Sequence, residues 1–252
     1  MGRDPQAGRV LRRREVLTLF GTAAGVIAVT AAAGGSDSAQ STRKALAGAV
    51  TLPSCIVRPA QTEGPYFADE KLLRSDIRSD PTGGSVKQGV PLRLVFRVSQ
   101  LRGPSCTPLA GATVDVWHCD ALGVYSDVED PLFGNTKGKK FLRGYQFTDA
   151  AGTAQFTTIY PGWYRGRTVH IHFKIRTGPA SGLRHEFTSQ LYFDDALTDR
   201  VHARAPYASK GRRTVRNAAD GIFRSGGKQL LLHPKEEGPG YAAIFDVALQ
   251  MS

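Results

Sequence analysis

The stretch TVHIHFKIR at positions 168–176 carries the clearest secondary-structure signal in this chain of 252 residues. Apolar side chains stand at every second position (Val169, Ile171 and Phe173), with polar side chains between them. Because successive side chains of a β-strand point to opposite faces, this alternation predicts a strand that buries one face in a hydrophobic core.

Comparable apolar runs recur at 92–98, 113–119, 154–160, 187–193 and 241–249. Turns rich in Gly and Pro separate them, and the sequence contains 28 Gly and 14 Pro. Strands at this spacing predict an all-β fold, an antiparallel β-sandwich with long loops, in one domain over residues 50–252. A weak helical period is visible near 194–205.

Composition and charge describe a globular chain rather than a disordered one. The hydrophobic fraction is 41%, and 33 Lys and Arg against 22 Asp and Glu give a formal net charge of +11. Residues 1–33 supply +3 of this, because five Arg oppose Asp4 and Glu15, which leaves +8 on the rest. The basic residues are dispersed and no groove-reading motif accompanies them, so we expect a solvated basic surface and no nucleic-acid partner.

The first 33 residues have the three parts of an export signal. A run of arginines at 12–14 precedes an apolar stretch that ends in small residues at Ala33, and the paired arginines resemble a twin-arginine signal. The alternative is a retained membrane anchor, but about 18 residues of this composition barely span a bilayer. We therefore expect a cleaved signal at 1–33, recognised by the export machinery, and a flexible lead-in at 34–49. The protein should reach the cell exterior or the outer cell envelope already folded, without stable membrane association.

Two histidines and two tyrosines form a candidate metal site. His170 and His172 share the polar face of the strand quoted first, about 7 Å apart at Cα, so both imidazoles can reach one ion. A solvated polar face is the alternative for such a pair. Tyr164 lies six residues before the first histidine, and Tyr125 lies just beyond the predicted strand 113–119. Two phenolates and two imidazoles suit a hard, oxidised ion such as Fe(III), whereas thiolates suit zinc or clusters.

Five long and specific stretches contain or flank these candidates. They are TEGPYF (62–67), PLAGATVDVWHCDALGVYS (108–126), FLRG (141–144), TIYPGWYRGRTVHIHFKI (158–175) and SQLYF (189–193). Together, and in this order, they resemble the intradiol ring-cleavage dioxygenases, the family of protocatechuate and catechol dioxygenases, and especially its secreted branch.

The resemblance implies a role for each candidate ligand. Tyr125, His170 and His172 match the ligands that hold iron throughout turnover. Tyr164 matches the axial ligand that leaves when substrate binds, which makes it a catalytic residue as well, because the released phenolate can accept a substrate proton.

The resemblance also implies a substrate pocket. Arg167 stands where the family keeps an arginine over the bound ring, in a catalytic and substrate-binding role. Gln190 matches a catalytic pocket glutamine, for which a purely structural hydrogen bond within the sheet is the alternative. Gly64, Pro65 and Tyr66 match the segment that lines the substrate mouth, where Tyr66 is expected to pack rather than to ligate.

The implied activity is that of a dioxygenase with one non-haem Fe(III) ion per chain. It would insert both atoms of O₂ into catechol-type diols and cleave between the two hydroxylated carbons, giving cis,cis-muconate-type diacids. The loop from Tyr164 to His170 is shorter than in the protocatechuate enzymes, so their carboxylate recognition is not implied. Substituted catechols, hydroxyquinol and protocatechuate all stay open as substrates.

A non-catalytic β-sandwich is the competing interpretation. The runs PLAGATVDV, TDAAGTAQF and PGWY also resemble the transthyretin-like modules that secreted proteins use as structural domains. That reading explains the strands but leaves the tyrosine and histidine constellation, and Arg167, as coincidence. An adhesive or sugar-binding module has still less support.

Three cysteines stand at positions 55, 106 and 119. In an oxidising compartment they predict one disulfide and one free thiol. An extended run from Cys106 to Cys119 would hold these two too far apart to bond. We therefore favour Cys55–Cys106, with Cys119 a buried thiol near the metal site, and Cys55–Cys119 is the alternative.

Overall fold

The computed structural model describes residues 55–81, 83–131, 134–178 and 185–251. The predictions for the signal at 1–33 and the lead-in at 34–49 lie outside these residues. Within the described ranges, none of the helices combines the length and the apolar character that a membrane crossing needs.

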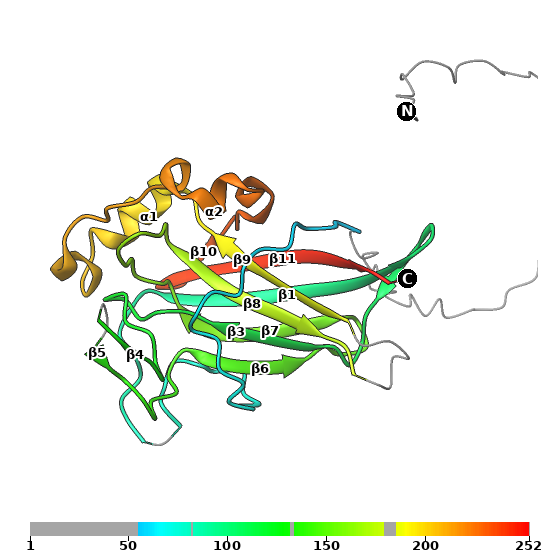
Figure 1. The fold of residues 1–252 in the computed structure, drawn as a ribbon, viewed down its shortest axis with the longest axis horizontal. Coiled ribbons are helices and arrows are strands. Elements are labelled where there is room, and N and C mark those ends of the chain that lie inside the picture. The colour runs from blue at the N-terminus through cyan, green and yellow to red at the C-terminus, as the bar shows by residue number, and fades with distance from the viewer. Residues whose placement is uncertain (1–54, 82, 132–133, 179–184, 252) are drawn as a thin grey trace, which may run out of the picture. The chain divides into compact units, whose positions relative to one another are not determined.

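Two β-sheets form the core of the described chain (Figure 1). The first sheet contains β1 (Pro91–Arg102), β2 (Ser105–Pro108), β7 (Thr153–Ile159), β10 (Lys235–Glu237) and β11 (Gly240–Gln250). In this sheet β11 lies between β10 and β1, while β2 and β7 both pair with β1. The long β1 has room for both, because it pairs with β7 along Pro91–Arg97 and with β2 along Ser99–Arg102.

The second sheet carries the stretch with the two histidines. It contains β3 (Thr113–Trp117), β6 (Arg143–Phe147), β8 (His170–Arg176) and β9 (Glu186–Tyr192), in the order β6-β3-β8-β9. All of its pairs are antiparallel. A separate small hairpin is formed by β4 (Glu129–Asp130) and β5 (Gly134–Asn135).

Aromatic side chains from both sheets meet in the core. Phe173 of β8 lies 5.2 Å from Phe96 of β1 and 5.5 Å from Phe245 of β11, measured between ring centroids. All three are at most 2% exposed, and full burial of one such side chain stabilises a fold by roughly 1.5–3 kcal/mol. Because Phe173 faces this core, His172 and His170, which stand one and three positions before it in β8, face away from the core. The predicted β-sandwich is confirmed.

Two features of the fold differ from the sequence-based expectation. The β1–β11 pair is parallel, whereas the other strand pairs of the two sheets are antiparallel. Side-chain alternation is the same in both directions, so it cannot distinguish the two.

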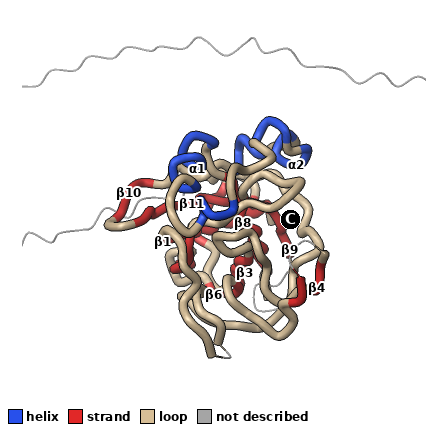
Figure 2. Tube along the Cα trace, turned by 90° about the vertical axis from the view of Figure 1, so that its left-hand side faces the viewer, coloured by secondary structure: helices blue, strands red, loops and turns tan. Residues whose placement is uncertain are grey.

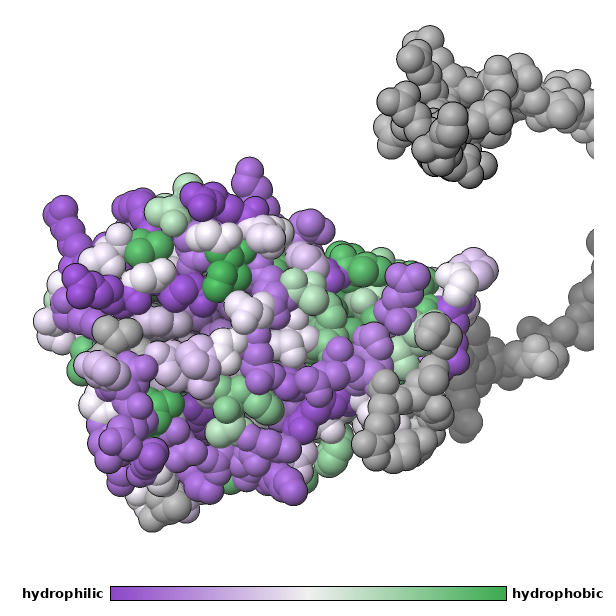
Figure 3. Space-filling model, viewed as in Figure 1, coloured by the Kyte–Doolittle hydropathy of each residue, from purple (hydrophilic) through white to green (hydrophobic). Residues whose placement is uncertain are grey.

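The second difference is a helical region between β9 and β10. It contains α1 (Asp195–His202), η2 (Tyr207–Lys210), η3 (Asn217–Ala219), α2 (Gly221–Arg224) and η4 (Gly227–Leu230). The period near 194–205 indicates α1, but elements of three or four residues are too short to produce a recognisable period. These helices gather along one side of the sheets (Figures 1 and 2). The face of the molecule drawn in Figure 3 is mostly hydrophilic, with small apolar patches.

The described chain begins with a segment that is fastened to the sandwich before it reaches the candidate site. The disulfide Cys55–Cys106, with Cα atoms 6.0 Å apart, joins its first described residue to β2. Val57 then bridges to Ala248 of β11, and the Gln61 amide donates to the Thr188 carbonyl of β9 at 3.0 Å. Together these contacts bring residues 62–67 to the histidine face of the second sheet.

Candidate active site

His170 and His172 project from the same face of β8 and converge. Their Nε2 atoms lie 3.0 Å apart, and both side chains are almost completely buried. The Nδ1 atom of His170 lies 2.6 Å from the Thr168 carbonyl oxygen. Because a carbonyl can only accept, Nδ1 carries the proton, and the lone pair of Nε2 points toward His172. A backbone carbonyl that fixes the tautomer in this way is a regular feature of metal-ligating histidines.

Both imidazoles are held in the neutral form. Burial, with Arg167 adding to it, lowers the pKa of His170 to about 3. Burial and the neighbouring His170 lower the pKa of His172 well below its ordinary value. Neutral imidazole is the form that donates a lone pair to a metal ion.

Two tyrosines complete the cluster. The hydroxyl oxygen of Tyr164 lies 3.1 Å from His170 Nε2. The Tyr125 ring is 5.6 Å from that of Tyr164 and 6.4 Å from that of His172, between centroids. The structure therefore brings together all four residues predicted as ligands, from β8, from the loop after β3 and from the loop after β7.

Both phenols are buried. Burial, with the neighbouring Tyr164 adding to it, raises the pKa of Tyr125 well above its ordinary value, and burial likewise raises the pKa of Tyr164. Without a cation both side chains therefore stay protonated, and only a strong Lewis acid can displace the two protons. Among the described residues no group of three or more His, Cys, Asp and Glu could hold a metal ion. The phenol oxygens of Tyr125 and Tyr164 are the candidate donors beside the two histidines.

Close backbone packing positions the two tyrosine loops. Asp120 Oδ1 accepts hydrogen bonds from the amides of Leu122 and Val124, which closes the turn before Tyr125. Gly123, at φ +78°, lies so close to the Trp163 carbonyl that an added Cβ would come within 2.1 Å of it. The loop that presents Tyr125 and the loop that presents Tyr164 therefore touch main chain to main chain, and a side chain at Gly123 would separate them.

Arg167 and Gln190 form a hydrogen-bonded pair beside the cluster. Arg167 Nη2 donates to Gln190 Oε1 at 2.6 Å, and Gln190 lies opposite His172 in the β8–β9 register. Gln190 Nε2 in turn donates to the Thr62 carbonyl at 2.9 Å. Gln190 therefore joins Arg167 to the mouth segment in addition to its place in the sheet.

The predicted mouth residues differ in their contacts. Gly64, at φ +73°, lies against His172, whose Cε1 would be 3.2 Å from an added Cβ. The Tyr66 ring packs on Tyr125 at 4.7 Å, and its hydroxyl donates to Asp130 Oδ2 at 3.0 Å. Burial and Asp130 raise the pKa of Tyr66 to about 12, so Tyr66 remains a protonated packing residue. Pro65 is exposed.

Three further residues at the site were not predicted from the sequence. Trp117 stacks on His172, with ring centroids 5.0 Å apart and planes at 9°. Arg143, buried at the start of β6, donates to Ser126 Oγ at 2.8 Å and to the Tyr66 carbonyl at 2.5 Å. Trp117 and Arg143 lie within two of the stretches that resemble the family (108–126 and 141–144), and this position was the signal that could have identified them. Asp220, which binds Arg167, stands in none of them.

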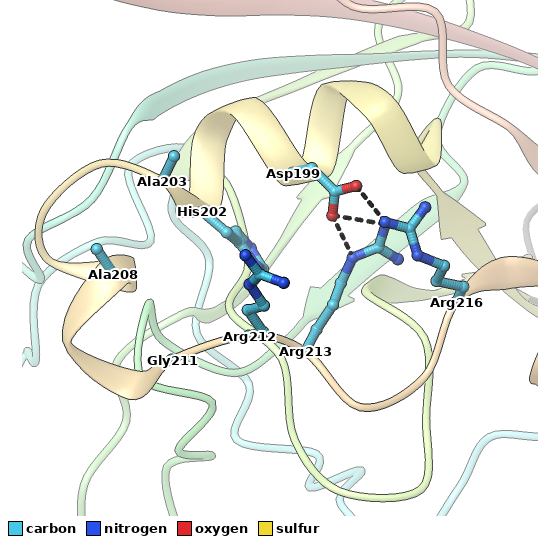
Figure 4. Close-up of a pocket in the computed structure, with 8 residues that line it drawn as sticks. All are labelled: Asp199, His202, Ala203, Ala208, Gly211, Arg212, Arg213 and Arg216. Atoms are coloured by element: carbon cyan, nitrogen blue, oxygen red, sulfur yellow. Dashed lines mark hydrogen bonds and ion pairs between the residues drawn. The ribbon is translucent and has the colours of Figure 1, made fainter.

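A cavity of about 620 Å³ lies away from this cluster, between α1 and the segment after η2 (Figure 4). Its lining residues are Asp199, His202, Ala203, Ala208, Gly211, Arg212, Arg213 and Arg216. Its walls support the loop that carries Tyr164, because His202 Nε2 donates to the Pro161 carbonyl at 3.0 Å and Trp163 Nε1 donates to the Gly211 carbonyl at 3.2 Å.

Comparison with known proteins places the chain in a family. A family model described as "Dioxygenase" matches residues 62–215. The protocatechuate 3,4-dioxygenase beta chain of Burkholderia cepacia is 30% identical over 202 residues, which cover 74% of this chain and 76% of the relative. The catechol 1,2-dioxygenase 1 of Acinetobacter lwoffii is 28% identical over 163 residues, which cover 54% of this chain but only 49% of the relative.

A solved structure agrees with both relatives. The intradiol ring-cleavage dioxygenase from Tetranychus urticae superposes with a TM-score of 0.67 at 30% identity, covering 78% of this chain and 95% of that one. The resemblance noted in the sequence is thereby confirmed at the level of the family. The chain belongs to the intradiol ring-cleavage dioxygenases.

Proposed function

We propose that this protein is an iron(III) dioxygenase that inserts both atoms of O₂ into catechol-type diols and cleaves between the two hydroxylated carbons. The products would be cis,cis-muconate-type diacids. One observation carries the proposal: two neutral imidazoles and two buried phenols converge on one point without any carboxylate or thiolate among them.

This donor set fits Fe(III). Tyr125, Tyr164, His170 and His172 would hold one ion, and anionic phenolate oxygens suit an oxidised, hard iron rather than Fe(II) or zinc. When bound, the ion supplies Lewis-acid chemistry and a template for the diol. Tyr125 is 0% exposed whereas Tyr164 is 8% exposed, so Tyr164 is the phenol that can give way to an incoming diol.

The side chains of this protein supply the proton transfer and the electrostatics. When Tyr164 gives way, its phenolate oxygen can accept a proton from the diol, so the neutral histidines need not act as bases. Arg167, fixed by Gln190 and Asp220, is positioned to stabilise negative charge that develops on the substrate ring. Trp117 and Tyr66 pack against the ligands and keep water from this side of the cluster.

The substrate is proposed as a small catechol without a commitment to its substituents. The relatives named above act, by their names, on catechol and on protocatechuate. Asp130 lies next to Tyr66 at the mouth segment, and a carboxylate there repels an acidic substituent that points toward it. Neutral catechols are therefore the first substrates to test.

We also propose that the protein is exported in folded form by a twin-arginine-type route. The arginine run at 12–14 and the apolar stretch to Ala33 support this. A protein that crosses folded can receive its iron in the cytoplasm beforehand. Sequencing the N-terminus of the mature protein tests the proposal, which requires cleavage near Ala33 and loss of export when the arginines become lysines.

Metal analysis together with a visible spectrum tests the activity. The purified protein should contain about one iron per chain and show the red-brown colour of tyrosinate bound to Fe(III), which dithionite should bleach. With catechol it should consume O₂ and form a product that absorbs as a muconate. A colourless protein that stays inactive after iron is added would instead support the structural-module alternative.

A further inference from the structure

A single buried carboxylate joins the helical region to the candidate active site. The Asp220 side chain is 1% exposed and uses both oxygens. Its Oδ1 accepts from the amides of Ile222 and Phe223 at 2.7 and 3.0 Å. Its Oδ2 accepts from Arg167 Nε and from the Thr168 amide, both at 2.8 Å.

The two oxygens have different tasks. Oδ1 caps the N-terminus of α2, which is an ordinary role for an aspartate. Asp194 does the same at α1, where its side chain accepts from Ala196 and Leu197. Asp194 is exposed, however, whereas Asp220 is buried and also binds Arg167. Capping therefore does not account for the second oxygen of Asp220 or for its burial.

The Oδ2 contacts fix two parts of the site at once. Arg167 donates a hydrogen bond from Nε to Asp220 and another from Nη2 to Gln190. These two hydrogen bonds set the plane of its guanidinium. The Thr168 amide is held by the same oxygen, while the Thr168 carbonyl accepts the proton of His170 Nδ1. The peptide that orients His170 is therefore anchored on one side by Asp220.

The pair stays charged in spite of its burial. Burial acts to raise the pKa of Asp220, but the hydrogen bonds from the Thr168 amide and Arg167 outweigh it and hold that pKa below its usual value. A buried carboxylate is tolerated only where donors replace its lost hydration, and Asp220 has four. If one partner is removed, the other charge is left buried without compensation.

We propose that Asp220 is a positioning residue that fixes the direction of the Arg167 guanidinium over the substrate. The inference rests on the proposed function and adds to it a residue that lies beyond the matched range 62–215. Without the carboxylate, Arg167 keeps its contact with Gln190 but can rotate about it. The positive charge of Arg167 remains, but its guanidinium no longer has a fixed direction, so turnover falls more than substrate binding does.

The test compares Asp220→Asn with Asp194→Asn in the full iron-loaded protein. Asparagine is as good a helix cap as aspartate, so both variants keep an N-cap and only the first loses a carboxylate at Arg167. We expect Asp220→Asn to lower kcat by about 10–100-fold, the usual effect of removing a partner that orients a site residue. KM should change less, and iron content and the tyrosinate band should stay as in the wild type. Asp194→Asn should stay within about twofold in kcat.

Two further readouts separate positioning from a general structural effect. In the Arg167→Lys background, Asp220→Asn should cause little additional loss, because both changes act through the same guanidinium. The Arg167 Nε proton, followed by NMR in the protein freed of iron, should exchange slowly in the wild type and in Asp194→Asn but rapidly in Asp220→Asn.

The outcomes are distinct from those of the proposed function. If the wild-type protein neither binds iron nor turns over catechol, the proposed function itself is wrong. An active wild type whose Asp220→Asn variant matches Asp194→Asn in kcat and proton exchange overturns the positioning role, as does a full multiplicative loss in the Arg167→Lys background. If Asp220→Asn does not fold, Asp220→Glu takes its place. It keeps the charge but shifts it by one methylene, and an unchanged kcat with this variant also overturns the role.

Discussion

Two regions of this protein combine histidine with arginine, and they are organised in opposite ways. In the cavity beside α1, Arg213 and Arg216 are paired with Asp199, and Asp199 and Arg216 are 42% and 61% exposed at the side chain. In the candidate site the donors are buried, and the lone pair of His170 points at His172 instead of at a carboxylate. In the cavity, Arg213 and Arg216 already have a carboxylate partner, whereas in the candidate site Tyr164 and His172 both lie beside the unprotonated nitrogen of His170. Convergence of donors, rather than cavity volume, therefore marks the site.

The largest expected effect is loss of iron when a buried ligand is removed. Tyr125→Phe or His172→Ala should lower iron occupancy severely, because the proposed function assigns each of them as a ligand that is needed throughout turnover. Tyr164→Phe should keep most of its iron while turnover slows, because the proposed function assigns Tyr164 as the ligand that gives way to the substrate. Metal analysis and the visible spectrum measure this, with Tyr160→Phe as a control that alters a buried tyrosine outside the cluster. Equal iron loss in Tyr125→Phe and Tyr164→Phe would refute the division of roles.

A smaller effect is expected at Arg167. Arg167→Lys should keep iron and colour but lose turnover by about a hundredfold, which is typical when a directed donor to developing charge is removed. Lysine supplies the charge without the planar donors that Gln190 and Asp220 hold. Steady-state O₂ uptake measures the change. Arg216→Lys, in the cavity, is the control for an arginine that only pairs at the surface, and near wild-type rates for Arg167→Lys would make Arg167 equivalent to it.

A stability effect is expected at Arg143. Its guanidinium is the donor to the Tyr66 and Ser126 carbonyls and to Ser126 Oγ. Arg143→Met keeps the bulk but leaves these buried acceptors unsatisfied, at a cost of about 1–3 kcal/mol each at most. Urea unfolding should show a lower midpoint. Arg97→Met is the control, because its pair with Asp246 is half-exposed and should contribute under about 1 kcal/mol.

The smallest effect should appear in the cavity. Arg216→Ala removes one exposed ion pair with Asp199, so the free energy of unfolding should fall by no more than about 1 kcal/mol. Iron content and kcat should be unchanged. A clear loss of iron in this variant would show that the cavity and the Tyr164 loop are more tightly coupled than their separate contacts indicate.

The sequence predicted what local patterns encode. Alternation identified the strand that carries His170 and His172, and the resembling stretches supplied Tyr125, Tyr164 and Arg167. The direction of β11 beside β1 was not accessible, because alternation does not depend on strand direction. The short helices were not accessible either, because a single turn has no period.

Contacts between residues that are distant in the sequence could not be predicted, for a different reason. Asp220 and Arg167 are separated by 53 positions. An aspartate directly before the short helix α2 indicates, from the local sequence, only a helix cap. Arg143 lies in one of the quoted stretches but was given no role, because two of its three acceptors are main-chain carbonyls and the third is Ser126 Oγ, and no local sequence pattern indicates such contacts. Contacts of this kind become visible only when the tertiary structure is known.

The disulfide between Cys55 and Cys106 has a mechanical consequence. Tension applied to the chain upstream of Cys55 is transmitted through the bond into β2, whose neighbour β1 lies at the centre of the first sheet. The force therefore bypasses residues 56–67, which run from the disulfide to the mouth of the site. The mouth segment is thus protected from tension on the chain that precedes the disulfide. Movements of whatever precedes Cys55 need not disturb Gly64 or Tyr66 where they lie against the candidate ligands.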